Sequence, residues 1–442
     1  MTTGHDGADA PVGALAIEPL RHPPGTTVRV PGSKSVTNRA LVAAALADGE
    51  SRLGGVLVAD DTMAMVEALR RLDIAVDLDQ AGAVATVAGT GGRLPSRAVT
   101  VDARQSGTTA RFLAPLLALG AGAYRLDGSA QLRARPMGPT FDALTALGAR
   151  VEAVGEPGRL PVSVVGGGLR GGEVAVAGDV SSQFLSGLLL AGPAMPDGLV
   201  VRLTTEPVSR PYLDLTVATM VAFGATVDRP EDRTFAVAPG GYRPTSYEVE
   251  PDASAASYFF AAAVITGGRV RVEGLGTGTV QGDLAFVDVL AQMGARVERA
   301  AGWTEVSAAG TLHGVDVDLS QLSDTAQTLA AVAVFADGPT RVRGVGFIRA
   351  KETDRIAAVV QELRRCGLDA EEHDDGFTVH PGTPRPTRVR TYDDHRMAMS
   401  FALLGLRVPG IEVEGPGCVA KTYPGYFADL ARLGAVPPGG DR

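Results

Sequence analysis

The residues best suited to chemistry in this chain are its three lysines. Lys34, Lys351 and Lys421 are the only lysines among the 41 Lys and Arg residues of the 442-residue sequence. An ammonium group is a compact charge that can release its proton, whereas a guanidinium stays protonated. Because the chain uses arginine for nearly every other cation, we expect the lysines to serve one purpose and to meet at one site.

Lys34 lies in the stretch 31–39, PGSKSVTNR, which also contains Asn38, the only asparagine. The apolar run ALVAAAL follows directly at 40–46. A helix without a polar face must be surrounded by protein, so its polar residues can act only from its first turn. Free N–H groups and the positive end of the helix dipole make such a turn an anion site. Ser, Thr and Asp there are also ordinary N-caps, and this alternative stays open.

The elements that position these residues recur every 70 to 75 residues or so, a spacing that indicates an internal repeat. A polar turn followed by a nearly uncharged helix occurs at 34–41, 106–113, 181–188, 252–259, 323–330 and 393–400. An amphipathic helix that ends in a stop signal alternates with it at 65–73, 141–152, 217–224, 286–294, 359–367 and 426–434. Short alternating stretches between the helices, such as 99–102, predict strands.

The repeat therefore predicts six α/β units of the order strand, buried helix, strand, amphipathic helix, strand, strand. Six units exceed one core, and three plus three is the simplest grouping. Turn residues concentrate at 239–251, just before the fourth unit, and mark the break. A propeller lacks such helices and a helical solenoid lacks such strands.

Composition excludes several functions. The net charge of −9 disfavours nucleic acid as a partner. No apolar run is long enough to span a membrane, and residues 1–12 show neither a signal nor a transit peptide but a frayed tail. The two cysteines, Cys366 and Cys418, form no disulfide framework, so we expect a cytoplasmic protein. The six histidines lack metal-ligand spacing, and we expect neither a metal nor a cofactor.

Cations also stand where amphipathic helices begin: Arg133 and Arg135, then Lys351, then Lys421. A cation at a helix N-terminus opposes the dipole, and a bound anion would resolve the conflict. Simple solvation of each charge is the alternative. It weakens when two of the three lysines share this placement and the third opens a buried helix.

Eight motifs together resemble the 5-enolpyruvylshikimate-3-phosphate synthase family, in the right order from 31 to 427. They are PGSKSVTNRAL, SGTTARFLAPL, RARPM, SSQFLSGLLLAGP, SRPYLD, KETDRI, DDHRMAMSFAL and AKTYPGYF. The resemblance implies transfer of the enolpyruvyl group of phosphoenolpyruvate to shikimate 3-phosphate, with no cofactor. It implies a two-domain, inside-out α/β barrel of six βαβαββ repeats, three per domain, with the site in the interdomain cleft. The domains would be 1–30 plus 251–442 and 31–250, and we expect a monomer.

Position by position, the resemblance implies roles for named residues. Shikimate 3-phosphate would contact Lys34, Ser35, Arg39, Ser181, Ser182, Gln183, Ser209, Tyr212, Asp324 and Lys351. Phosphoenolpyruvate would contact Lys34, Gly107, Arg135, Gln183, Arg355, Arg396 and Lys421. The catalytic residues would be Lys34, Asp324, Glu352 and His395, with Asp324 as the proton acceptor and Glu352 as a candidate acid.

The sequence differs from the family pattern at a few positions, and two other classes of protein are alternatives. Phe112 stands where many relatives have proline, and Arg104 and Gln105 replace a Gly/Asn pair. Both changes adjoin Gly107 and bear on affinity for phosphoenolpyruvate and for the inhibitor glyphosate. UDP-N-acetylglucosamine enolpyruvyltransferase has the same fold, but it uses an early cysteine, and no cysteine precedes Cys366 here. A different class is a non-catalytic anion-binding repeat protein or an enzyme relative that has lost activity. The presence of Lys34, Asp324, Glu352, Arg396 and Lys421 together argues against both, because a mere binder needs no carboxylates beside anions.

Overall fold

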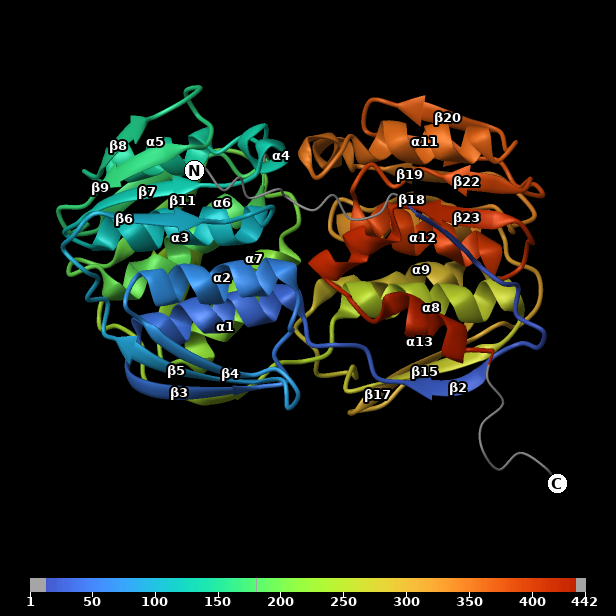
Figure 1. Ribbon diagram of the computed structural model, residues 1–442, viewed down its shortest axis with the longest axis horizontal. Helices are drawn as coiled ribbons and strands as arrows, with labels where there is room; N and C mark the ends of the chain where they lie inside the picture. The colour runs from blue at the N-terminus through green and yellow to red at the C-terminus, as the bar shows by residue number, and fades with distance from the viewer. Residues whose placement is uncertain (1–12, 180, 435–442) are drawn as a thin grey trace, which may run out of the picture.

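The chain forms two lobes that lie side by side in the computed structural model, which describes residues 13–179 and 181–434 (Figure 1). The expectation for the tail, residues 1–12, lies outside the described residues. Buried hydrophobic residues form two clusters, one within 36–249 and the other within 17–30 and 253–433. These cores support the domain division at 31–250 and 1–30 plus 251–442, which stays our proposal.

The predicted apolar helices occupy the interiors of both lobes. They are α1 (Lys34–Leu46), α3 (Gly107–Leu119), α6 (Ser182–Ala191), α8 (Ala253–Thr266), α10 (Ala326–Ala333) and α12 (His395–Gly405). In α1 every residue except Lys34 and Ser35 is buried, because the sequence offers no polar face to solvent. The prediction of six buried helices is confirmed.

The residue before five of these helices caps the first turn with its side chain. The caps are Ser33, Ser106, Ser181, Asp252 and Asp394. α10 instead continues from a 3-10 turn, η3 (Ser323–Thr325). The capping interpretation is thus right for the residue just before each of these five helices.

The amphipathic helices are also confirmed. They are α2 (Asp60–Arg71), α5 (Gly138–Ala146), α7 (Pro211–Ala222), α9 (Phe286–Gln292), α11 (Arg355–Arg365) and α13 (Tyr426–Arg432), and a short α4 (Ala130–Arg133) precedes α5. α2 begins at Asp60 rather than at the predicted Met65. Asp60 and Asp61 occupy the positive end of its dipole, which stabilises the earlier start.

In the described part of the chain, six small sheets surround these helices, and three of them are contiguous units as predicted. In each, the first two strands are parallel and the last strand pairs antiparallel with its neighbours. These sheets contain β6 (Val99–Asp102), β7 (Ala123–Asp127), β8 (Arg150–Ala153) and β9 (Val162–Val165); β10 (Gly172–Val176), β11 (Leu199–Leu203), β12 (Val227–Glu231) and β13 (Thr234–Val237); and β18 (Asp316–Asp318), β19 (Thr340–Arg343), β20 (Ala370–His373) and β21 (Gly376–Val379).

The other three sheets each borrow a strand from a distant part of the chain, which the simple repeat did not predict. β14 (Ser246–Glu248) joins β3 (Asp48–Gly54), β4 (Ala75–Asp79) and β5 (Val84–Thr90); β2 (Gly25–Val28) joins β15 (Arg269–Glu273), β16 (Arg296–Arg299) and β17 (Trp303–Ser307); β1 (Ala14–Ala16) joins β22 (Thr387–Val389) and β23 (Ile411–Glu414). β1 and β2 thus bring the N-terminal segment into the second lobe, as the resemblance implied. The reason for the exchange is that the chain changes lobes directly before α1 and α8.

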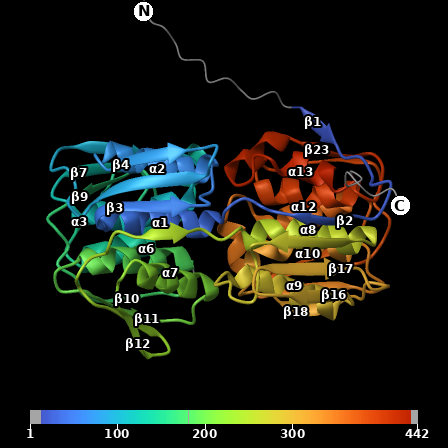
Figure 2. The same ribbon diagram turned by 90° about the horizontal axis from the view of Figure 1, so that it is seen from below.

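The two crossings between the lobes run together (Figure 2). The Ser33 amide donates to the Glu250 carbonyl at 2.8 Å, and the Asp252 amide donates to the Pro31 carbonyl at 2.9 Å. A Cβ on Gly32 would stand 1.9 Å from the Gly55 oxygen, so only glycine fits at this crossing. The lobes therefore share a hydrogen-bonded pair of connections at the starts of α1 and α8.

Candidate active site

The three lysines converge at the boundary between the lobes, and the prediction that they meet is confirmed. The Lys34 ammonium lies 3.3 Å from one carboxylate oxygen of Asp61, and the Lys421 ammonium lies 3.1 Å from the other. Lys421, at the end of η5 (Pro416–Lys421), also donates to the Gln105 carbonyl at 2.9 Å. One buried carboxylate thus joins a lysine of each lobe.

Lys351 completes this group from the end of η4 (Gly346–Ala350). Burial lowers the pKa of its ammonium to about 8, while the nearby Asp324 and Glu352 carboxylates act in the opposite direction. Glu352 also lies 3.9 Å from the Lys421 ammonium. Lys351 is therefore a lysine that can lose its proton in mildly alkaline solution.

Asp324, at the start of the buried helix α10, is held by two arginines. Arg396 donates to its Oδ2 at 2.6 Å and to its carbonyl at 2.9 Å, and Arg355 donates to its Oδ1 at 3.3 Å. Burial would raise the pKa of Asp324, but Arg396, Lys351 and Arg355 together bring it below its ordinary value. This carboxylate is ionised and accepts hydrogen bonds from both arginines.

Glu352 faces a second set of cations. Arg355 donates to it at 2.8 Å, and Arg135 of the other lobe lies 3.7 Å away. Burial opposes ionisation, but Arg355, Arg135 and Lys421 hold the pKa of Glu352 well below its usual range. Without substrate, both Glu352 and Asp324 are therefore anions among cations.

Arg355 and His395 are oriented by the start of α12. Asp394 accepts from Arg355 at 2.7 and 3.2 Å and is itself fully buried. His395 is buried beside it, and neither ring nitrogen has a hydrogen-bond partner among the described residues. Burial, reinforced by Lys34 and Arg396, lowers the pKa of His395 well below its ordinary value, so the imidazole is neutral.

The turn before α3 brings Gly107 against Arg135. A Cβ on Gly107 would stand 2.8 Å from guanidinium nitrogens of Arg135 and Arg111, so glycine lets these cations approach the helix start. Arg111 donates to the Gln183 side-chain oxygen at 2.7 Å, and Gln183 donates to Thr108 at 3.2 Å. Gln183 is thereby fixed on the same side of the cleft as Arg135.

The remaining predicted residues lie at helix starts of the first lobe. Ser181 caps α6, Ser182 is its first residue, and Ser35 lies in the first turn of α1. Ser209 has a positive φ of 53° and contacts the second lobe through its amide, which donates to Ser320 at 3.2 Å. No hydrogen bond or ion pair joins Ser181 or Ser182 to the lysines in the described part of the chain.

Tyr212 and Arg39 differ in their surroundings. The Tyr212 hydroxyl lies 3.3 Å from Asp324 Oδ2, across the boundary between the lobes. Arg39 is 1% exposed, and all three of its guanidinium nitrogens donate to protein groups, at Thr216, Ser35, Ser186 and the Tyr212 carbonyl. Arg39 thus supports the floor of the cleft in this structure.

Asp61 is the clearest residue that sequence reasoning missed. It is 3% exposed and lies at the start of α2, where the prediction began only at Met65. The paired Asp60 and Asp61 before an amphipathic helix were the available signal. Arg111 and Asp394 were missed as well, although both lie inside motifs that were recognised.

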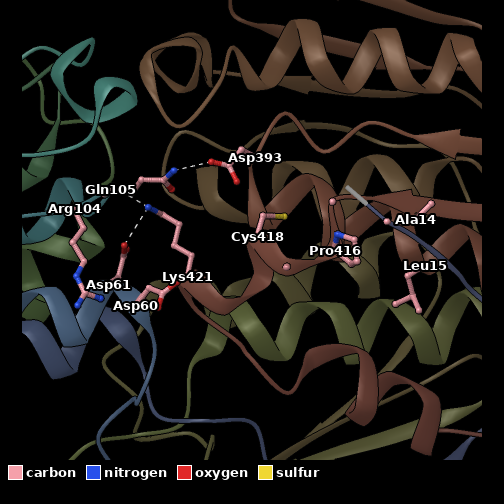
Figure 3. A pocket seen from close by; sticks show the side chains of 13 residues that line it. Ala14, Leu15, Asp60, Asp61, Arg104, Gln105, Asp393, Pro416, Cys418 and Lys421 are labelled. Atoms are coloured by element: carbon pink, nitrogen blue, oxygen red, sulfur yellow. Dashed lines mark hydrogen bonds and ion pairs between the residues drawn. The ribbon is translucent and has the colours of Figure 1, made fainter. Parts of the chain in front are cut away.

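A cavity of about 850 Å³ opens beside Lys421 and Asp61 at the boundary of the lobes. Figure 3 shows Asp61 and Lys421 facing each other in it, with Gln105 reaching toward Asp393. The Gln105 amide donates to Asp393 at 2.7 Å. The cavity is bounded by both lobes and reaches the candidate site at Asp61 and Lys421.

Within residues 13–179 and 181–434, no three His, Cys, Asp or Glu side chains are grouped so that they could hold a metal ion. Over the same residues, no helix has the length and apolar character needed to cross a membrane.

The fold is that of the enolpyruvyl transferases, with α/β units arranged in two lobes. The enolpyruvyl transferase NikO from Streptomyces tendae superposes with a TM-score of 0.74 at 21% identity, over 96% of this chain and 98% of that chain. EPSP synthase from Acinetobacter baumannii superposes with a TM-score of 0.80 at 30% identity, over 95% of this chain and 97% of that chain.

The sequence defines the family within this class. The family model for EPSP synthase (3-phosphoshikimate 1-carboxyvinyltransferase) matches residues 23–430. A 3-phosphoshikimate 1-carboxyvinyltransferase from Nostoc punctiforme is 44% identical over 95% of this chain and 99% of its own length. Another from Thiobacillus denitrificans is 44% identical over 92% and 96%. The chain belongs to the EPSP synthase family.

Proposed function

We propose that this chain transfers the enolpyruvyl group of phosphoenolpyruvate to the 5-hydroxyl of shikimate 3-phosphate and releases phosphate. The product, 5-enolpyruvylshikimate 3-phosphate, leads to chorismate and the aromatic amino acids. The observation that carries the proposal is the site between the lobes, where Asp324 and Glu352 lie among three lysines and three arginines. Cations suit two acidic substrates, and carboxylates suit proton transfer.

Phosphoenolpyruvate would compete with the protein's own carboxylates for the cations of the site. Its phosphate and carboxylate match the forked guanidinium groups and the point charges of the lysines. We assign its contacts to Lys34, Gly107, Arg135, Gln183, Arg355, Arg396 and Lys421. Several of these cations are paired with Asp61, Asp324 or Glu352 in the substrate-free protein, so binding exchanges one set of ion pairs for another.

Shikimate 3-phosphate would lie toward the first lobe. We assign its contacts to Lys34, Ser35, Arg39, Ser181, Ser182, Gln183, Ser209, Tyr212, Asp324 and Lys351. Ser209 and Tyr212 touch the second lobe directly, so a ligand on them is sensed by both lobes. We therefore propose that binding stabilises the closed arrangement.

The chemistry is an addition followed by an elimination. Asp324 accepts the proton of the 5-hydroxyl group while the hydroxyl oxygen bonds to the enol carbon of phosphoenolpyruvate. The methylene carbon of phosphoenolpyruvate gains a proton. The bond from the former enol carbon to the phosphate oxygen then breaks, releasing phosphate, and the new methyl group loses one proton to restore the double bond. Lys34 stabilises the charge that develops between the two substrates.

Glu352 is the candidate acid at the methylene carbon, although it is ionised in the substrate-free site. An anion bound to Arg135, Arg355 and Lys421 would weaken the field of these cations and raise the pKa of Glu352 toward neutrality. His395, a neutral imidazole beside the same cations, lines the site as the second candidate for holding that proton.

Phosphate release from purified protein tests the proposal. We expect release with phosphoenolpyruvate and shikimate 3-phosphate together, and none with UDP-N-acetylglucosamine as acceptor. The cysteines fit this expectation, because Cys366 is fully buried and burial raises the pKa of Cys418, at the cavity, to about 12. Phosphate release with phosphoenolpyruvate and UDP-N-acetylglucosamine, but not with shikimate 3-phosphate, would instead favour a UDP-N-acetylglucosamine enolpyruvyltransferase.

Lys34→Met gives a sharper test of the site. Methionine keeps the length of the side chain but removes its charge, so we expect turnover to be nearly abolished. Arg93→Met is the matched control, because Arg93 and its partner Asp48 are exposed. Wild-type turnover in Lys34→Met would remove Lys34 from the site.

We also propose that the protein is a monomer in the cytoplasm and works without a cofactor. Both cysteines are free thiols, which suits a reducing compartment. Among the described residues, the exposed large hydrophobic side chains are Val154, Val221 and Val280. These three valines lie far apart in the sequence. Sedimentation of the purified chain tests the oligomeric state.

A further inference from the structure

A third carboxylate, Asp283, lies behind the proposed base and has no part in the mechanism above. It is 4% exposed, in the 3-10 turn η2 (Gly282–Ala285). The Tyr212 hydroxyl lies 2.9 Å from its Oδ2, and the Ser254 hydroxyl donates to the same oxygen. The same Tyr212 hydroxyl is 3.3 Å from Asp324. A row of groups, Ser254, Asp283, Tyr212 and Asp324, therefore runs from the interior to the cleft.

The Tyr212 hydroxyl cannot serve both carboxylates at once. A phenol carries one hydrogen, so it donates to Asp283 or to Asp324 but never to both. When it donates to one carboxylate, contact with the other requires that carboxyl group to carry its own proton. The arrangement thus couples the proton on Asp283 to the hydrogen bond that Asp324 receives.

Asp283 is also incompletely bonded. Its Oδ1 is buried and has no hydrogen-bond partner among the described residues. A cavity of about 10 Å³ adjoins it, lined also by Ser35 and Asp252, with room for roughly one water molecule. A buried carboxylate with a free oxygen is costly to ionise, because no group in the described part of the chain donates a hydrogen bond to that oxygen.

The surroundings of Asp283 and Asp324 shift the pKa values of the two carboxyl groups in opposite directions. Tyr212 faces Asp283 from α7, Ser254 from α8, Asp252 from the residue before α8, Asp324 from η3, and Arg396 from α12. Burial, followed by the negative charge of Asp324, raises the pKa of Asp283 to about 6, although Arg396 acts in the opposite direction.

We propose that Asp283 is a positioning residue for enolpyruvyl transfer: through Tyr212, its protonation state sets how strongly Asp324 attracts the proton of the 5-hydroxyl. The inference rests on the proposed function, in which Asp324 is the base. When Asp283 is ionised, Tyr212 donates to it, and Asp324 keeps only its arginine bonds beside a second negative charge. Asp324 is then the stronger base.

The acid form has the opposite effect. A protonated Asp283 donates to the Tyr212 oxygen, and Tyr212 then donates its own hydrogen to Asp324. This added hydrogen bond, together with the loss of the neighbouring charge, weakens Asp324 as a base. Turnover should therefore fall as the pH drops through the range in which Asp283 takes up its proton.

The test is the pH dependence of kcat between pH 5 and 9 with both substrates saturating. We expect the wild type to lose activity toward low pH with a midpoint near 6. In Asp283→Asn the side chain is neutral at every pH, so this acid limb should vanish and kcat at pH 8 should fall roughly tenfold, the effect of one charge-assisted hydrogen bond. An unchanged acid limb in Asp283→Asn would overturn the inference.

A second variant keeps the test decisive if Asp283→Asn does not fold. Ser254→Ala removes a hydrogen bond that favours the ionised form of Asp283, so the acid limb should move to higher pH. An acid limb that stays in place would overturn the inference while leaving the proposed function intact. A wild type that releases no phosphate would overturn both.

Discussion

Replacing Asp61 with asparagine should make the substrate-free site a stronger anion binder and a poorer catalyst. Asp61 supplies the carboxylate between Lys34 and Lys421, at 3.3 and 3.1 Å. Its side chain is 4% exposed, so solvent screens the three charges little. Asp61→Asn keeps the shape of the side chain but removes the negative charge that opposes a bound phosphate.

The magnitude follows from Coulomb's law. An anion on the far side of either ammonium lies about 6 Å from the Asp61 carboxylate, given an ion-pair contact of about 2.8 Å beyond the lysine. At an effective dielectric constant of about 20, that repulsion is about 3 kcal/mol. Some of this is lost because the lysines are no longer held in place, so we expect phosphate to inhibit the variant on the order of tenfold more tightly.

The assay is inhibition by inorganic phosphate against phosphoenolpyruvate, together with kcat. Asp60→Asn is the matched control, because it makes the same charge change one residue away on an exposed side chain. We expect Asp61→Asn to tighten phosphate inhibition and lower kcat, and Asp60→Asn to do neither. Equal effects of the two variants, or weaker phosphate inhibition in Asp61→Asn, would refute the reasoning.

Three further expectations concern other residues of the site. Asp394→Asn leaves the buried Arg355 short of a charge partner and should lower the free energy of unfolding by about 3–5 kcal/mol. Asp393→Asn changes the exposed neighbour and should alter the free energy of unfolding by less than about 1 kcal/mol. Equal losses of stability in denaturant unfolding of the two variants would contradict this. Lys351 loses its proton above a pKa of about 8, so the KM for shikimate 3-phosphate should rise there, and Lys351→Arg should abolish that rise because a guanidinium stays charged; an alkaline rise that persists in the variant would assign it elsewhere. Shikimate 3-phosphate should reduce the radius of gyration in small-angle scattering, and equal radii with and without it would count against ligand-induced closure.

Sequence reasoning found the helices because their patterns are local. A helix with no polar face, such as α8, can only be buried, and a charged stripe such as that of α11 can only face outward on one side. The pairings of the strands that complete three of the sheets were not predicted from local patterns. The pairing of β14 with β3 joins residues far apart in sequence, and no local pattern encodes it. For β1 and β2, only the resemblance indicated the second lobe.

The candidate site divides in the same way. The lysines were identified by their rarity, Glu352 by the KETDRI motif, and Asp324 by its position in the family resemblance. Asp61 and Asp283 were missed. The Asp60 and Asp61 pair indicates a helix start but no partner, and Asp283 has no local signal, so the fold alone places them beside a lysine and a tyrosine. Their surroundings, rather than their identity, give them their expected roles.

The borrowed strands also set the order in which the protein can mature on the ribosome. β1 is made first, but its partner β23 spans Ile411–Glu414, close to the end of the chain. Among the described residues, the first lobe takes no strand from beyond β14, so it can complete its sheets while the rest is still being synthesised. Throughout that time β1 has an open hydrogen-bonding edge, which is the kind of edge that invites pairing with another molecule. Translation that stalls after β14 would therefore leave one finished lobe carrying an unpaired N-terminal strand.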